Sequence, residues 1–188
     1  EGEQAVLQDE SLSEVTLTLP VLLKGERVDL DWARQGLQLV VGGAAVSIPT
    51  PEGEEQERGA LLLFDFSEKR AQPDVIPLWI SLDNSEAAIE PVWSPDGSRI
   101  AFVMCTRQPN GTLVRKALMV VPADGGTPTE IVSGEIYTPD WAPDGQRLVF
   151  AMGSPGNRQI YTVRLDGTEL KSLTQSGDYI SPRWSPRQ

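Results

Sequence analysis

WSPDGSRIAF, at residues 93–102, is repeated as WAPDGQRLVF at residues 141–150. The phrase begins again as WSP at residues 184–186, and a less similar copy, WARQGLQLV, occupies residues 32–40. The first residues of the four copies are tryptophans that stand 61, 48 and 43 residues apart. A period of about 40 to 50 residues is typical of β-propellers, in which each blade is a sheet of four strands. The repeat therefore predicts an all-β protein built from such blades.

A tight turn lies at the centre of each full copy. Proline fixes φ at the first turn position, aspartate tolerates the next, and Gly97 or Gly145 accepts the positive φ that a three-residue hairpin with a bulge requires. The tryptophans that begin the copies are expected to fill the gaps between neighbouring blades. We therefore predict structural roles for both glycines and for Trp32, Trp93, Trp141 and Trp184.

Turn signals and apolar runs divide the chain into three units of four strands. The first unit is predicted to have strands at residues 27–32, 38–41, 60–66 and 75–80. The second has them at 90–93, 99–104, 117–121 and 129–132, and the third at 138–141, 147–152, 159–164 and 170–173. Residues 100–104 are apolar without alternation, which is typical of a strand buried on both faces between two neighbouring sheets.

These units predict one propeller-type domain over residues 1–188, an arc of about three four-stranded blades. Blade 1 covers residues 27–89 and contains an insertion, blade 2 covers 90–137, and blade 3 covers 138–178. Residues 179–188 begin a further blade, and residues 1–26 form an N-terminal segment whose strand at 14–19 belongs to a preceding blade. The acidic stretch at residues 51–59 is expected to be a solvated loop.

The charge balance excludes one class of partner. The formal net charge is −11, and residues 1–60 carry 12 acids and 4 bases, a net charge of −8. Such a surface repels phosphate backbones, so we expect no nucleic-acid partner. The chain also lacks the apolar run of about 18 or more residues that a membrane-spanning segment requires.

The sequence offers little catalytic chemistry. It contains no histidine, no Gly-x-Ser-x-Gly turn, no phosphate-binding Gly-x-x-x-x-Gly-Lys loop and no dinucleotide fingerprint. Its one cysteine, Cys105, ends an apolar run and is interpreted as a core residue. We therefore expect no enzyme activity, no cofactor and no metal.

The repeated phrase, with a basic, an aliphatic, a small and a Phe residue in its second half, resembles the blade motif of TolB-like propellers. Residues 160–169 and 173–177 are similar to the third and fourth strands of the same family. The resemblance is specific over residues 90–186 and weaker over 27–89. It implies a periplasmic or other extracytoplasmic propeller that binds protein partners, as TolB-like proteins bind lipoproteins and toxins. Related propellers also precede the hydrolase domain of prolyl-oligopeptidase-type peptidases.

We therefore expect a protein-binding or assembly module. The alternatives are the propeller portion of a prolyl-oligopeptidase-type serine hydrolase and a structural subunit of a larger envelope complex. Loops that join a fourth strand to the next first strand gather at one end of a propeller, where acids and tyrosines can form a recognition surface. The candidate partner-binding residues in these loops are Asp83, Glu86, Glu90, Glu135, Tyr137, Asp178 and Tyr179.

TolB-like rings have six blades or more, whereas three are predicted here. The chain is then part of a larger ring, or two copies pair as a homodimer that closes a six-bladed ring, or another protein caps the arc. An open arc would leave apolar blade faces exposed, and such faces normally find a partner.

Sedimentation equilibrium distinguishes the paired ring from the other two arrangements. A homodimer should sediment at twice the 20.5 kDa of one chain. A stable species with the mass of one chain, unchanged on concentration, would exclude the paired ring.

Overall fold

The computed structural model describes residues 5–9, 12–17, 28–34, 36–49, 54–68 and 72–185. These residues form fourteen strands and no helix, as the repeat predicts. In this part of the chain there is accordingly no helix long and apolar enough to cross a membrane.

Twelve of the strands form three antiparallel sheets in which each strand pairs with the next one along the chain. Blade 1 contains β3 (Asp29–Trp32), β4 (Gln38–Pro49), β5 (Glu55–Asp65) and β6 (Asp74–Ile80). Blade 2 contains β7 (Glu86–Trp93), β8 (Arg99–Arg107), β9 (Leu113–Pro122) and β10 (Thr129–Ser133). Blade 3 contains β11 (Ile136–Trp141), β12 (Arg147–Met152), β13 (Gln159–Arg164) and β14 (Lys171–Ser172).

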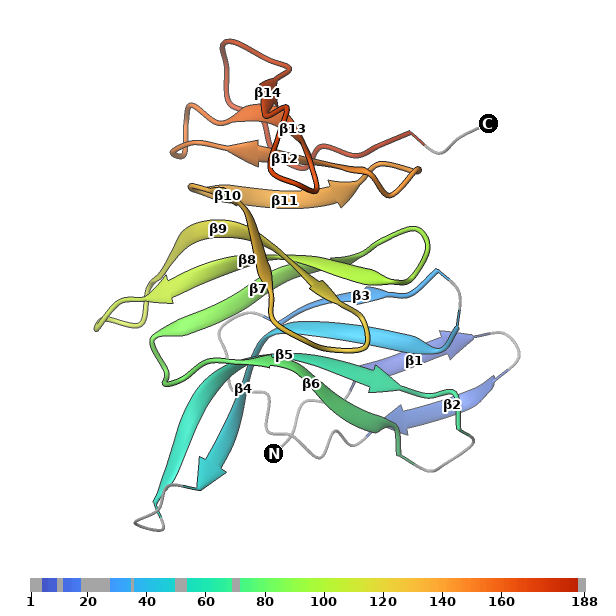
Figure 1. The fold of residues 1–188 in the computed structure, drawn as a ribbon. Helices are drawn as coiled ribbons and strands as arrows, with labels where there is room; N and C mark the ends of the chain where they lie inside the picture. Colours follow the sequence, from blue (N-terminus) through green and yellow to red (C-terminus); the bar gives the residue numbers. More distant parts are fainter. Residues whose placement is uncertain are drawn as a thin grey trace.

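The three sheets stack with blade 2 between blades 1 and 3 (Figure 1). Their first strands lie side by side, because β3 contacts β7 and β7 contacts β11. The described residues thus form an unclosed arc of three propeller blades, with the first strand of each blade on the inner side.

Each gap between blades is filled by apolar side chains from both sides. Ile100 and Phe102 of β8 pack toward blade 1, whereas Ala101 and Val103 of the same strand pack toward blade 3. All four are fully buried, and this two-sided burial explains why the strand is apolar without alternation. Cys105 continues the second set and is also fully buried.

Trp93 and Trp141 lie in successive gaps and are 4% and 2% exposed. The indole Nε1 of Trp93 donates a hydrogen bond to the Asp31 carbonyl oxygen in blade 1, at 3.1 Å. The indole Nε1 of Trp141 repeats this contact with the Val92 carbonyl oxygen in blade 2, at 3.0 Å. Each ring therefore fills a gap and fixes the height of one blade against the previous one.

One expectation about blade 1 needs correction. The acidic insertion is not a loop from residue 55 onward, because β4 and β5 continue as a hairpin arm to the pair Pro49–Glu55; residues 50–53 lie outside the described part. The arm of β4 and β5 projects from the blade (Figure 1) and needs no apolar face, so its charged residues gave no strand signal.

The strand predicted at 14–19 is found as β2 (Leu12–Leu17), and its partner is β1 (Ala5–Asp9) in a separate two-stranded sheet. Residues 18 and 19 are not described.

A substitution at Gly59 tests the packing of blade 1 against blade 2. A Cβ atom at this position would lie 2.1 Å from the Glu86 carbonyl oxygen at the start of β7. We expect Gly59→Ala to lower the free energy of unfolding by about 1–3 kcal/mol, since backbone must move to relieve the overlap. Urea unfolding measures this, with Ser47→Ala, at an exposed position on the same arm, as a control that should change stability by less than about 0.5 kcal/mol. Equal midpoints for Gly59→Ala and wild type would contradict the described packing.

Candidate partner-binding site

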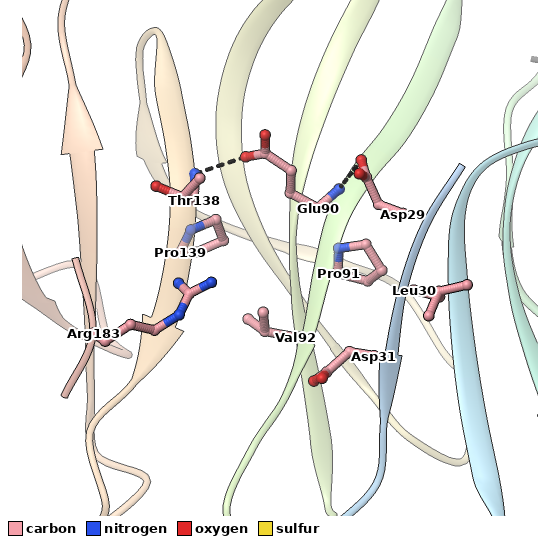
Figure 2. Close-up of a pocket in the computed structure, with 9 residues that line it drawn as sticks. All are labelled: Asp29, Leu30, Asp31, Glu90, Pro91, Val92, Thr138, Pro139 and Arg183. Carbon is pink, nitrogen blue, oxygen red and sulfur yellow. Dashed lines mark hydrogen bonds between the residues drawn. The ribbon is translucent and has the colours of Figure 1, made fainter. Parts of the chain in front are cut away.

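The residues just before each tryptophan line the inner side of the arc. They enclose a groove of about 220 Å³, here called the axial groove (Figure 2). Three consecutive residues come from each of the first strands β3 and β7, two come from β11, and one residue follows blade 3. The groove is lined by Asp29, Leu30, Asp31, Glu90, Pro91, Val92, Thr138, Pro139 and Arg183.

The residues three positions before the tryptophans connect successive blades, and we call them the linking residues: Asp29, Glu90, Thr138 and Ser181. The Glu90 N–H donates to Asp29 Oδ2 at 3.1 Å, and the Thr138 N–H donates to Glu90 Oε2 at 2.7 Å. The Ser181 N–H donates to Thr138 Oγ1 at 2.9 Å. One side chain in each blade therefore accepts the equivalent backbone N–H of the next.

The backbone of the linking residues explains how these N–H groups become available. Glu90, Thr138 and Ser181 have φ values of 50°, 46° and 56°, in the left-handed region that non-glycine residues rarely adopt. The ladders of β7 and β11 are interrupted at the same places, between Ile89 and Val92 and between Tyr137 and Asp140. A bulge of this kind removes one N–H from its own sheet and makes it available to the neighbouring blade. Its conformational strain of about 1–3 kcal/mol is offset by the hydrogen bond gained.

The residues directly before the tryptophans form a second set, the facing residues: Asp31, Val92, Asp140 and Arg183. Asp31 Oδ2 accepts the Trp93 N–H and Asp140 Oδ2 accepts the Trp184 N–H, both at 2.8 Å. Figure 2 shows Asp31 and Arg183 in the groove on either side of Val92.

The surroundings of Asp31 disfavour the charged form of its carboxyl group. Burial raises the pKa of its carboxyl group above the ordinary value, and the nearby Asp140 raises it further. The hydrogen bond from Trp93 and the positive charge of Arg183 act in the opposite direction but do not cancel the effect of burial. The groove therefore contains a carboxylate that would gain from a cationic partner.

The structure distributes the seven predicted partner-binding residues over several environments. Asp83 lies exposed in the turn between β6 and β7, where its Oδ1 accepts the Ser85 N–H at 2.7 Å. Glu86 begins β7 and Glu135 precedes β11, and both are half-buried. Tyr179 is 44% exposed.

Glu90, Tyr137 and Asp178 are brought together by two arginines that the sequence did not indicate. Arg115 of β9 forms a two-pronged ion pair with Glu90, at 2.7 and 3.0 Å, and its guanidinium carbon lies 4.2 Å from the centre of the Tyr137 ring. The guanidinium carbon of Arg158 lies 5.1 Å from the same ring centre. We call Glu90, Arg115, Tyr137, Arg158 and Asp178 the tyrosine cluster. Glu90 belongs to β7 and is buried, and Tyr137 belongs to β11 rather than to the loop predicted there.

Arg158 pairs with Asp178 in the same two-pronged way. Its Nε donates to Asp178 Oδ1 at 2.7 Å and its Nη2 to Oδ2 at 2.6 Å. These hydrogen bonds hold the pKa of Asp178 well below its usual range and raise the pKa of Arg158. Both groups are therefore charged at neutral pH.

Comparisons with known proteins agree with this geometry. A family model described as the TolB beta propeller domain matches residues 78–188. TolB from Acinetobacter baumannii is similar with a TM-score of 0.61 and 17% identity, over 93% of this chain and 38% of that chain. A puromycin-hydrolysing peptidase from Mycobacterium tuberculosis is similar with a TM-score of 0.56 and 17% identity, over 88% of this chain and 26% of that chain. The chain thus spans well under half the length of either protein, and these likenesses show a shared fold.

Asp31→Asn tests the cost of the buried charge, because asparagine keeps an oxygen for the Trp93 N–H. The raised pKa of Asp31 means that the folded protein binds this proton more tightly than the unfolded chain. The stability that this tighter proton binding contributes is therefore complete below the unfolded pKa of about 4, and it is lost as the pH rises through the folded pKa of Asp31. In urea unfolding, we expect the variant to be more stable than wild type at neutral pH, with the difference vanishing toward about pH 4.

The matched control is Asp124→Asn, which removes an exposed carboxylate in the turn between β9 and β10. It should leave the urea midpoint nearly unchanged over the same pH range. A lower midpoint for Asp31→Asn than for wild type at neutral pH would show that the charge stabilises the fold.

Proposed function

Because the chain belongs to the TolB β-propeller family, we propose that it is a non-enzymatic module that binds a protein partner through the axial groove. One observation supports this above all. The side chains of Asp29, Glu90 and Thr138 are used between blades, whereas Asp31 lines the groove as a partly buried carboxylate whose pKa is raised by burial. The family relationship also supports a location outside the cytoplasm, in the periplasm.

The walls of the groove favour an extended segment of the partner. Leu30 is 54% exposed and, with Pro91 and Pro139, supplies apolar surface next to the charged residues. Asp31 in the groove wall, with Asp140 near enough to raise its pKa, suits a lysine or arginine side chain. Charge complementarity of this kind gives specificity and fast association. Arg183 would receive a carboxylate or a backbone carbonyl from the same segment.

Exposed apolar residues in the connecting turns supply a second part of the proposed interface. Leu82, between β6 and β7, is 88% exposed, and Ile180, after β14, is 57% exposed. With Tyr179, Asp83, Glu86 and Glu135 they would form a rim that contacts the partner beyond the groove. A polar rim around a more apolar centre is the usual composition of a protein interface.

Three further proposals come from the sequence. The chain could serve as the propeller portion of a prolyl-oligopeptidase-type hydrolase, which a downstream Gly-x-Ser-x-Gly segment with Asp and His in the complete reading frame would establish. It could be a structural subunit of a larger envelope complex. It could also pair with a second copy, for which sedimentation is the test.

Isothermal titration with short peptides tests the groove. We expect acetyl-Gly-Lys-Pro-Lys-Gly-amide to bind wild type, and the double variant Asp31→Asn, Asp140→Asn to bind it at least about tenfold more weakly. Asparagine preserves the acceptors for the two tryptophan N–H groups, so the change isolates the charge. The charge-matched control is Asp124→Asn with Glu130→Gln, two exposed positions away from the groove, and it should bind as wild type does. Absence of lysine-peptide binding, or equal binding of the glutamate analogue, would contradict the proposed partner chemistry.

A further inference from the structure

The segment after blade 3 is attached by a set of polar contacts. Residues 178–184 form no strand in the described structure, and Tyr179 and Ile180 are largely exposed. The backbone contacts are the Tyr179 N–H to the Arg158 carbonyl oxygen at 2.9 Å, together with the Ser181 and Trp184 N–H groups on blade 3. Of these residues only Pro182 and Trp184 are half-buried, so the position of the segment depends strongly on the groups that accept these hydrogen bonds.

Arg158 holds the start of the segment in three ways. Its guanidinium group binds the Asp178 carboxylate, its backbone N–H donates to Asp178 Oδ1 at 2.9 Å, and its carbonyl oxygen accepts the Tyr179 N–H. The Arg158 guanidinium in turn packs on the ring of Tyr137, which also contacts Arg115. Arg115 is fixed by Glu90 and by the Ile136 carbonyl oxygen at 2.8 Å. A continuous series of contacts thus runs from the linking residue Glu90 to Asp178.

The anchoring of Trp184 is less complete than that of the earlier tryptophans. Its backbone N–H is bound by Asp140, as that of Trp93 is bound by Asp31. The indole N–H groups of Trp93 and Trp141 each reach a carbonyl oxygen of the preceding blade. The indole Nε1 of Trp184 is buried but has no acceptor among the described residues. This segment therefore lacks one of the contacts that fix the equivalent strands β7 and β11.

We infer that the tyrosine cluster is a latch that positions the segment 181–184, and with it Arg183, against blade 3. Tyr137 and Arg158 are then positioning residues of the axial groove, acting through Asp178. When the latch is released, the segment leaves blade 3 without unfolding the blades, and the wall of the groove that Arg183 forms is lost. The inference concerns a mobile element of the fold and stands independently of the proposed peptide binding.

Amide hydrogen exchange, followed by NMR, measures the latch directly. The Ser181 and Trp184 N–H groups report the segment, and the Val149 and Phe150 N–H groups in β12 report blade 3 itself. We expect Asp178→Ala and Tyr137→Leu to speed exchange at Ser181 and Trp184 at least tenfold, with the β12 amides unchanged. Tyr137→Phe should retain wild-type exchange, because it keeps the ring on which both guanidinium groups pack.

The control is Glu169→Gln, which removes the partner of Arg147 in an exposed ion pair of the same blade. It should leave exchange at Ser181 and Trp184 unchanged. Unchanged exchange at these two amides in both latch variants would overturn the inference. An equal acceleration of the β12 amides, or the same acceleration in Glu169→Gln, would also overturn it, because the cluster would then stabilise the whole blade.

Discussion

The arrangement of the blades depends on one recurring interaction, in which a backbone N–H leaves its own sheet and binds a side chain of the preceding blade. Apolar packing between blades is strong but has no direction, so it cannot set the height or rotation of one sheet against another. The bonds from Glu90 to Asp29 and from Thr138 to Glu90 supply that direction. Glu90 takes part in both kinds of contact, because its carboxylate accepts the Thr138 N–H while it is paired with the Arg115 guanidinium group.

Much of the fold follows from local sequence because each blade has the same local requirements. The Trp-x-Pro-Asp-Gly phrase predicts a strand, a turn with positive φ and a second strand, and Gly97 and Gly145 have φ values of 71° and 67°. The resemblance to TolB-like propellers that the phrase indicated is confirmed by the family match. The hairpin arm of β4 and β5 was missed, since residues 55–58 pair with a strand but bury no continuous apolar face.

The site was less predictable, because its contacts join residues that are distant in sequence. Arg115 reaches Glu90 from 25 positions away and Arg158 reaches Asp178 from 20 positions away, and no local pattern specifies either pair. The linking and facing residues, in contrast, stand at fixed distances before the tryptophans. Aligning the four copies on tryptophan would have placed Asp29, Asp31 and Asp140 on the inner side of the arc. The turn signals directed attention instead to the loops, which contain only part of the candidate surface.

The facing residues differ in chemistry from one blade junction to the next, although the tryptophans beside them are held in the same way. At the junction of blades 2 and 3 the facing residue is Val92, and Trp141 still fills its gap and donates to the Val92 carbonyl oxygen. A carboxylate directly before the tryptophan is therefore not needed to join two blades. Asp31 nevertheless has a carboxylate there, although burial disfavours its charge, and Asp140 repeats the arrangement beside Trp184. The position before the tryptophan thus accommodates valine as well as aspartate, and the carboxylate of Asp31 is the part of the groove on which the proposed partner binding depends.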